Sequence, residues 1–342
     1  MPKVVTFGEI MLRLSPPGFE RLLQSPVLQA TFGGGEANVS VSLAQFGFES
    51  WYVTRVPAHG VGDAVIRALR AEGVRTDAIL RGGDRLGVYF TEMGASQRPS
   101  TVIYDRANSS IATLETGQID WPGVFTGASW FHVTGITPAL GERGAANTRE
   151  AMSAARAARL RVSVDLNFRK KLWTEKQAQA VMRPLVKGID VLIANEEDLQ
   201  SCLGVRVPDA DVTGGSLNLD GYREAAQAVA AEFGIRMVAI TLRESRSASD
   251  NGWSAVLWDQ ASGVFHHSQH FEVRLVDRIG GGDSFAAGLI YGLLAERPLD
   301  AALRFAVAAS ALKQTIPGDF NRVSVEEIDR LAGGDASGRV QR

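Results

Sequence analysis

A glycine-rich segment near the carboxyl end, DRIGGGD at residues 277–283, has the residue types and spacing for phosphate chemistry. Consecutive glycines let the backbone turn so that successive N–H groups converge on one anion. The apolar spacing that follows predicts a helix, so Gly280, Gly281 and Gly282 are expected at a helix N-terminus, where unpaired N–H groups and the helix dipole favour phosphate. Asp283 could then take a proton from an attacking hydroxyl. From spacing alone, an ordinary turn with Asp283 as its helix N-cap is an equal alternative.

A second glycine-rich segment, GGGEAN at residues 33–38, precedes another stretch with helical spacing, residues 39–46. Competing phosphate-binding schemes fit poorly. The sequence has no G-x-x-x-x-G-K-[ST] loop, which argues against a Walker-type nucleotide site. It also lacks the glycine loop, H-R-D and D-F-G set of protein kinases.

Composition and charge narrow the class of protein. The 342 residues are 45% hydrophobic and 22% charged, as in ordinary globular proteins, and can form a substantial core. The net charge of −2 gives no electrostatic basis for binding nucleic acid or an anionic membrane. The single cysteine, Cys202, excludes an intramolecular disulfide, and no apolar run is long enough to span a bilayer. We therefore expect a cytoplasmic protein without a membrane partner.

Strand-like and helix-like runs alternate from about residue 129 onward. Near-continuous apolar strands between such helices predict a parallel sheet covered on both faces, with ligands at the carboxyl ends of the strands. Residues 165–169 and Asn195 fall at such ends. Two stretches interrupt the alternation, about 12–31 and 85–108, and their short strand-like pieces predict a small β-sheet inserted into the α/β body. We expect one domain over residues 1–332 and a flexible tail over 333–342.

Both glycine segments resemble signatures of the ribokinase-like carbohydrate kinases, the PfkB-type family. Four further segments are similar to one branch of it, the 2-keto-3-deoxygluconate kinases: FHVTGITP (131–138), VDLNFR (164–169), TLRES (241–245) and GDFN (318–321). The resemblance extends from Val4 to about Leu331. It implies a three-layer α/β fold with a central, mostly parallel sheet and a small β-sheet that acts as a lid over the sugar. Excluding water under a lid protects the phosphoryl group from hydrolysis.

The resemblance also implies roles for individual residues. Asp283 corresponds to the general base, and the three glycines before it correspond to the anion hole. A monovalent cation such as K⁺ would bind near Asp277, for which a solvated aspartate at a strand end is an equal alternative. Asn195 and Asp198 align with an N-x-x-E motif that organises Mg²⁺ through water, although Asp198 is shorter by one methylene and both residues also suit a helix N-cap. The implied nucleotide-binding residues are Asn195, Thr241, Arg243, Ala311, Lys313 and Gly318.

Two arginines indicate the substrate class. A sugar acid carries a carboxylate that an arginine fork can hold, whereas a neutral sugar requires hydroxyl partners. The resemblance places Arg106 and Arg169 against the acid sugar, although Arg106 could instead be a surface cation. The other implied sugar-binding residues are Gly34, Asn38, Tyr89 and Tyr104.

The sequence thus predicts an ATP-dependent kinase that phosphorylates the terminal hydroxyl of 2-keto-3-deoxygluconate to 2-keto-3-deoxy-6-phosphogluconate. Two alternatives stay open: a kinase of the same fold acting on fructose, ribose or a related dehydro-sugar acid, and an inactive sugar-binding relative. An intact base and anion hole argue against the latter. The resemblance further implies a homo-oligomer, with the lid as the candidate contact surface.

Overall fold

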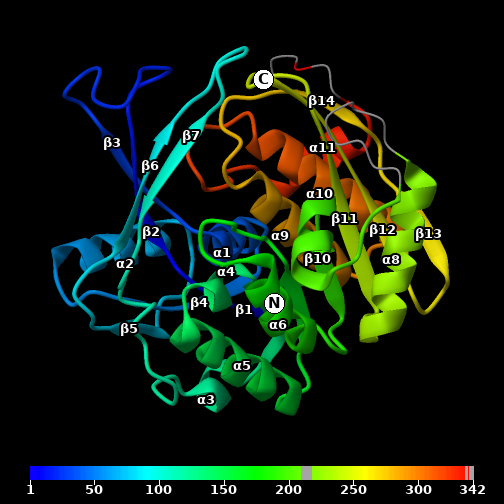
Figure 1. Ribbon diagram of the computed structural model, residues 1–342, viewed down its shortest axis with the longest axis horizontal. Helices are drawn as coiled ribbons and strands as arrows, with labels where there is room; N and C mark the ends of the chain where they lie inside the picture. Colours follow the sequence, from blue (N-terminus) through cyan, green and yellow to red (C-terminus); the bar gives the residue numbers. More distant parts are fainter. Residues whose placement is uncertain (209–217, 336–337, 339–342) are drawn as a thin grey trace.

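The body of the molecule is a large sheet between two layers of helices (Figure 1). The computed structural model describes residues 1–208, 218–335 and 338. The large sheet has the strand order β13-β12-β11-β10-β9-β8-β1-β4-β5, and β14 also pairs with β12. Neighbours from β11 to β5 are parallel, whereas β12 is antiparallel to β11, β13 and β14. Its strands are β1 (Lys3–Phe7), β4 (Glu49–Val56), β5 (Ile79–Arg81), β8 (Ala128–Thr134), β9 (Arg161–Asp165), β10 (Val191–Ala194), β11 (Met237–Ser245), β12 (Asp250–Asp259), β13 (Val264–His267) and β14 (Phe271–Arg274).

Helices cover both faces of this sheet, as predicted. One face packs against α3 (Trp121–Phe125), α5 (Glu142–Ala157), α6 (Glu175–Leu185) and α8 (Leu219–Phe233). The other packs against α1 (Gly35–Gln45), α2 (Gly60–Ala71), α9 (Gly281–Leu294), α10 (Leu299–Lys313) and α11 (Val325–Ala332). Central strands such as β10, with the sequence VLIA, are buried along their whole length because helices cover both sides.

The helix-like run after β10, at residues 196–203, is not a regular α-helix. It consists of a short α7 (Glu196–Asp198) followed by a π-helical turn over Leu199–Leu203. The wider turn places three consecutive side chains, Ser201, Cys202 and Leu203, in the interior. A short helix α4 (Ile136–Ala139) likewise follows a strand end, that of β8.

The two interrupting segments form one small sheet, as the sequence predicts. Its strand order is β3-β2-β6-β7, from β2 (Met11–Ser15), β3 (Gln29–Gly33), β6 (Gly87–Glu92) and β7 (Thr101–Asp105). Strand β2 pairs antiparallel with β3 and parallel with β6, so distant parts of the chain meet in one sheet. This small sheet stands to one side of the body in Figure 1.

The predicted tail falls largely outside the described residues, namely at 336, 337 and 339–342. Among the described residues, no helix has both the length and the apolar character needed to cross a membrane.

Candidate active site

A cavity of about 760 Å³ lies where the small sheet faces the strand ends of the body. That volume is typical of small-molecule sites. The small sheet contributes Met11, Tyr89 and Tyr104, and Asp165 and Asn195 come from the ends of β9 and β10. Most of the predicted site residues also line it: Gly34, Asn38, Arg106, Arg169, Asp198, Thr241, Arg243, Gly280, Gly281, Gly282 and Asp283.

The structure brings the two glycine segments together at Asp283. Gly34 is the N-cap of α1, and Gly280 is the N-cap of α9. The Asn38 side chain accepts from the Gly34 N–H (3.2 Å) and donates from Nδ2 to Asp283 Oδ2 (2.7 Å). Burial raises the pKa of Asp283 to about 6, although the bond from Asn38 and the charge of Arg169 oppose the shift. Asp283 is therefore a carboxyl group whose pKa suits a general base near neutral pH.

The turn before α9 requires glycine at its first position. Gly280 has φ +83°, in the left-handed region, and a Cβ there would lie 2.2 Å from the backbone oxygen of Asp319. A Cβ on Gly282, in contrast, would meet open space. The first turn of α9 therefore faces the cavity with room for an anion, and N–H groups in a first helical turn have no partner within the helix.

Glu36 fixes the start of α1 against the sheet. This carboxylate is buried, and its Oε1 accepts from the Thr134 N–H (2.9 Å), from Thr134 Oγ1 (2.8 Å) and from Thr137 Oγ1 (2.7 Å). Both threonines belong to the segment FHVTGITP. That segment therefore positions α1, and with it Asn38, at the end of β8.

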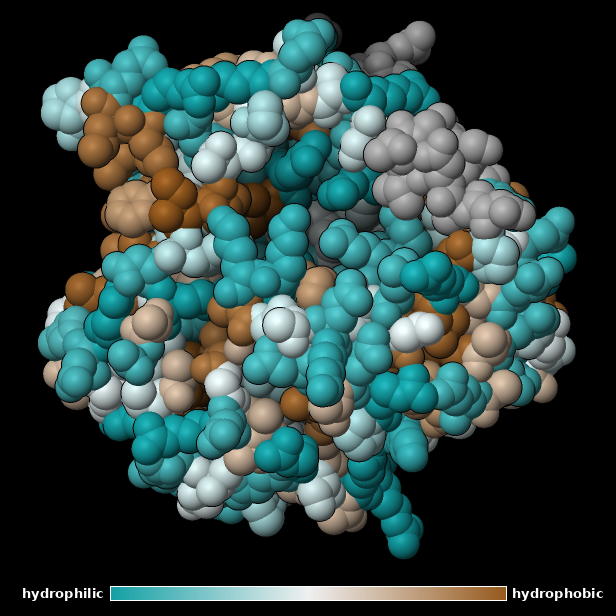
Figure 2. Space-filling view, viewed as in Figure 1, coloured by the Kyte–Doolittle hydropathy of each residue, from teal (hydrophilic) through white to brown (hydrophobic). Residues whose placement is uncertain are grey.

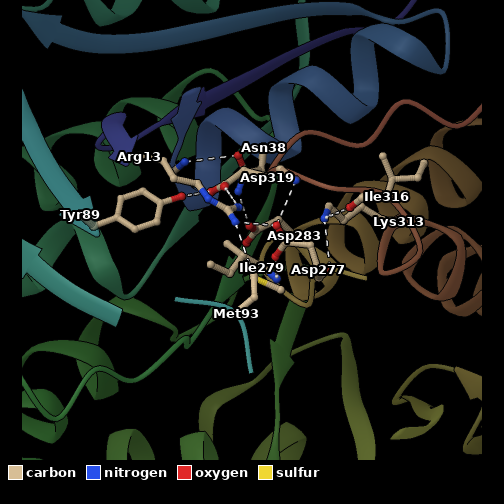
Figure 3. A network of polar contacts seen from close by, with 12 residues as sticks. Arg13, Asn38, Tyr89, Met93, Asp277, Ile279, Asp283, Lys313, Ile316 and Asp319 are labelled. Atoms are coloured by element: carbon tan, nitrogen blue, oxygen red, sulfur yellow. Dashed lines mark hydrogen bonds and ion pairs between the residues drawn. The ribbon is translucent and has the colours of Figure 1, made fainter. Parts of the chain in front are cut away.

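A buried polar network links the small sheet to the glycine turn (Figure 3). Arg13 on β2 donates to Asp277 Oδ2 (2.6 Å) and to Asp319 Oδ1 (2.7 Å), and all three side chains are buried. Tyr89 on β6 donates from its hydroxyl to Asp319 Oδ2 (2.6 Å). Asp277 also accepts from the backbone N–H groups of Ile279 and Gly318. The alternative of a solvated aspartate at position 277 is therefore wrong.

The two arginines predicted for the sugar acid have different surroundings. Arg106 is buried and pairs with Glu9 through both Nε and Nη2, so the surface-cation alternative is wrong. Arg169 follows β9, is half-buried and lines the cavity, and its Nη1 donates to the backbone oxygen of Phe168 (2.9 Å). Within the part of the chain that the structure describes, no carboxylate lies within 4.0 Å of Arg169 as an ion-pair partner. Of the two, Arg169 is the one with charge available to a ligand.

Aromatic rings form the wall of the cavity on the side of the small sheet. The rings of Tyr89 and Tyr104 lie 5.9 Å apart, and the Arg106 guanidinium lies 5.3 Å from the Tyr104 centroid. Tyr104 is partly exposed, whereas the Tyr89 hydroxyl already bonds Asp319. Tyr89 can thus offer a ligand its ring but has its hydroxyl proton committed to Asp319.

Asn195 and Asp198 form a complete capping box at the start of α7. Asn195 Oδ1 accepts from the Asp198 N–H (2.8 Å), and Asp198 Oδ2 accepts from the Asn195 N–H (3.1 Å). Asp198 Oδ1 accepts from the Phe168 N–H (2.8 Å), which ties α7 to the segment that carries Arg169. Burial raises the pKa of Asp198 to about 6. The predicted N-cap function is therefore present, and a water-mediated contact to Mg²⁺ stays a prediction.

The predicted nucleotide-binding residues do not all reach the cavity. Ala311, Lys313 and Gly318 lie outside its lining among the described residues, and Lys313 is fully buried. The sequence analysis missed Arg278, which lines the cavity near Arg243 and has a buried Nε without a partner in the described structure. Burial, followed by the charge of Arg243, lowers the pKa of Arg278. Its position in the segment DRIGGGD, two residues before the glycines, could have indicated that Arg278 belongs to the site.

Comparison with known proteins identifies the family. The model for the pfkB family carbohydrate kinases matches residues 1–322. The chain belongs to this family. A 2-dehydro-3-deoxygalactonokinase from Haloferax volcanii is 33% identical over 336 residues, 98% of each chain. The crystal structure of a 2-dehydro-3-deoxygluconokinase from Thermotoga maritima is 48% identical, with a TM-score of 0.94 over 98% of this chain and 100% of that one.

A more distant structure shares the fold alone. It is a protein assigned as a ribokinase from Escherichia coli, solved in complex with ATP and Mg²⁺, with 19% identity and a TM-score of 0.79 over 97% of this chain and 99% of that one. The predicted family and three-layer fold are thus confirmed, and the chain is a carbohydrate kinase.

Proposed function

We propose that this kinase phosphorylates the terminal hydroxyl of 2-keto-3-deoxygluconate, also called 2-dehydro-3-deoxygluconate, and forms 2-keto-3-deoxy-6-phosphogluconate. One observation carries the proposal: a single cavity holds Asp283, the anion hole at the turn before α9, and Arg169. Among the described residues, Arg169 has no carboxylate as an ion-pair partner. The names of the related enzymes from Thermotoga maritima and Haloferax volcanii support the same substrate class.

Asp283 is the group that takes the proton from the attacking hydroxyl. Asn38 keeps its carboxylate oriented by the 2.7 Å hydrogen bond, and Gly280, Gly281 and Gly282 present the start of α9 to the transferring phosphoryl group. Stabilising charge on that group supplies most of the rate in reactions of this type. When bound, ATP supplies the phosphoryl group, and Mg²⁺ neutralises the charge of its phosphates.

The described residues suit Mg²⁺ that is held mainly by phosphates and water. No cluster of three or more described His, Cys, Asp or Glu side chains has the arrangement of a metal site. Mg²⁺ in kinases commonly keeps several waters and needs only one or two carboxylates. Asp198 is the carboxylate we propose for a contact through water, and Arg243 and Arg278 provide positive charge for the nucleotide phosphates.

The carboxylate of the sugar acid is proposed to bind Arg169. An ionised carboxylate and a guanidinium form short, charge-assisted bonds, and the cavity offers Arg169 no such partner of its own among the described residues. Gly34, Asn38, Tyr89 and Tyr104 are proposed to contact the rest of the sugar, beneath the small sheet acting as a lid. Arg106, committed to Glu9, is proposed to support this wall of the site rather than to bind the carboxylate.

A coupled assay tests the proposal. Purified protein is given MgATP with 2-keto-3-deoxygluconate, its galactonate epimer, fructose or ribose, and ADP release is followed. The gluconate acid should have the highest kcat/KM, or share it with the galactonate epimer, from which it differs in configuration at one carbon. Fructose or ribose used at least as efficiently would refute the substrate assignment, and the alternative of a neutral-sugar kinase would replace it.

The small sheet is also the proposed contact between two copies of this chain. Large hydrophobic side chains are exposed on its segments, and Figure 2 shows hydrophobic residues gathered in this region. They are Phe19, Leu23, Val27, Ile103 and Tyr104. Sedimentation of the protein and of an Ile103→Glu variant tests the assembly.

The cytoplasm remains the compartment that we propose.

A further inference from the structure

Lys313 at the end of α10 places a charged group inside the protein, directly beneath the glycine turn. The side chain is completely buried, and its Nζ donates to the backbone oxygens of Asp277 (3.3 Å) and Ile316 (3.2 Å) (Figure 3). A Cβ on Gly280 would lie 3.2 Å from Lys313 Cε, so the lysine stem packs against the turn itself. A buried lysine is uncommon and needs compensating partners.

Four buried charged groups, counted here without the proposed base Asp283, have balanced charges beneath the glycine turn. Arg13 and Lys313 supply two positive charges, and the buried carboxylates of Asp277 and Asp319 supply two negative ones. Burial lowers the pKa of Lys313, the attraction of Asp277, Asp319 and Asp283 opposes that shift, and the repulsion by Arg13 adds to it. If Lys313 carried no charge, the group would hold one unbalanced negative charge beside the anion hole.

This arrangement does not fit the monovalent cation that the family resemblance implies near Asp277. Such a cation is held by oxygen ligands, and the oxygens here already have partners. The backbone oxygens of Asp277 and Ile316 bond the Lys313 ammonium. The Asp277 carboxylate accepts from Arg13 and from two backbone N–H groups, those of Ile279 and Gly318. A K⁺ ion here would also be repelled by the two buried cations, Arg13 and Lys313.

We propose that the Lys313 ammonium is a built-in substitute for the monovalent cation, and that phosphoryl transfer by this kinase therefore does not depend on K⁺. Lys313 acts as a positioning residue. It joins the loop before α9 to the loop after α10, and Ser310 reinforces the same link by donating to the backbone oxygen of Gly281 (2.7 Å). A covalently attached cation keeps the anion hole ordered before substrate arrives, whereas a diffusible one orders it only on binding.

The test compares cations at constant ionic strength. Kinase activity of the wild type is measured in KCl and in tetramethylammonium chloride, and the two rates should agree within about twofold. Lys313→Met removes the charge and keeps most of the stem. In tetramethylammonium its kcat should fall by roughly tenfold or more with little change in KM for the sugar, because the loss concerns charge stabilisation of the transferring group. K⁺ or NH₄⁺ should restore part of that loss, and Lys187→Met, at an exposed position, should behave as the wild type.

A second readout is independent of catalysis. The melting temperature of the wild type should not depend on K⁺, whereas that of Lys313→Met should be lower and should rise with K⁺ or NH₄⁺ but not with tetramethylammonium. The inference rests on the proposed function only for its kinetic part. If the wild type phosphorylates no sugar offered, the proposed function fails, and the melting curves still decide the role of Lys313.

Three results would overturn the proposal. The first is a wild-type activity that rises severalfold with K⁺, or a wild-type melting temperature that rises by several degrees with K⁺. The second is a Lys313→Met enzyme that is fully active without a small cation. The third is a Lys313→Met enzyme whose losses no small cation reverses, which would make the lysine merely structural. If Lys313→Met does not fold, Lys313→Gln takes its place, and the wild-type cation titration stands by itself.

Discussion

Arg169 and Arg106 should have different functions, and separate substitutions can show this. Arg169 should determine the preference for an acid sugar, and Arg106 should stabilise the fold. Arg169→Met removes a cation that has no carboxylate partner among the described residues, while the methionine preserves part of the stem. Arg106→Met removes one that pairs with the buried carboxylate of Glu9. The same chemical change is thus made once at a group available to the ligand and once at a group already neutralised by the protein.

The sizes of the two effects follow from these surroundings. A hydrogen bond to a charged group contributes about 1.5–3 kcal/mol, so Arg169→Met should reduce kcat/KM for 2-keto-3-deoxygluconate roughly 10- to 150-fold. The Arg169 charge also lowers the pKa of Asp283 and Asp198, which affects every substrate equally, so the ratio of acid to fructose isolates the contact with the carboxylate. Arg106→Met leaves Glu9 buried without its partner, which should cost about 3–5 kcal/mol of folding free energy.

The assay measures kcat/KM for the acid and for fructose, together with a melting curve, on each variant. Arg169→Met should collapse the acid-to-fructose ratio and leave the melting temperature nearly unchanged, and Arg106→Met should do the reverse. An acid-to-fructose ratio that survives Arg169→Met would refute the assignment of the carboxylate site. A ratio that collapses in Arg106→Met instead would transfer that role to the Glu9-paired arginine.

Three further predictions concern the base and its surroundings. Asp283→Asn should fold and lose about a hundredfold to ten-thousandfold in kcat, and near-normal turnover would remove it from the mechanism. The wild-type kcat/KM should fall as pH drops through about 6, because the base is then protonated. Asn38→Leu should move this acidic limb of the pH profile to higher pH, since it removes the hydrogen bond that lowers the pKa of Asp283. An acidic limb that does not move would show that another group is titrating. Gly280→Ala should destabilise the fold by at least about 1–2 kcal/mol because Gly280 has a left-handed φ. Gly282→Ala should melt normally and lose activity only because less room is left for the phosphate. Equal melting temperatures for the two variants would show that the turn adapts to a side chain at position 280.

The fold and the centre of the site could be predicted from the sequence because their signals are local. Apolar runs of strand length between helical patterns predict a parallel sheet covered on both faces, and this pattern does not depend on residues far away in the sequence. The glycine segments likewise predict the starts of two helices from local sequence. The strand order of the sheet then places these helix starts together, so that Asn38 can bond Asp283. The pairing of the small sheet followed less directly, since β2 and β6 lie far apart in the chain.

What the sequence did not disclose is which charged residues neutralise one another. Arg106 and Arg169 are the same residue type and both line the cavity, and only the folded chain shows that Arg106 pairs with Glu9 while Arg169 has no ion-pair partner among the described residues. Similarly, a lysine at the end of a helix such as α10 is ordinarily a solvated partner of the helix dipole. Lys313 is buried because the loops at residues 277–282 and 314–318 cover it. Arg13, on the small sheet, holds the first of these loops through its bond to Asp277, a residue far away in the sequence. Charge balance in this site is therefore a property of tertiary structure, and the glycine signature alone does not predict that a buried lysine lies beneath the anion hole.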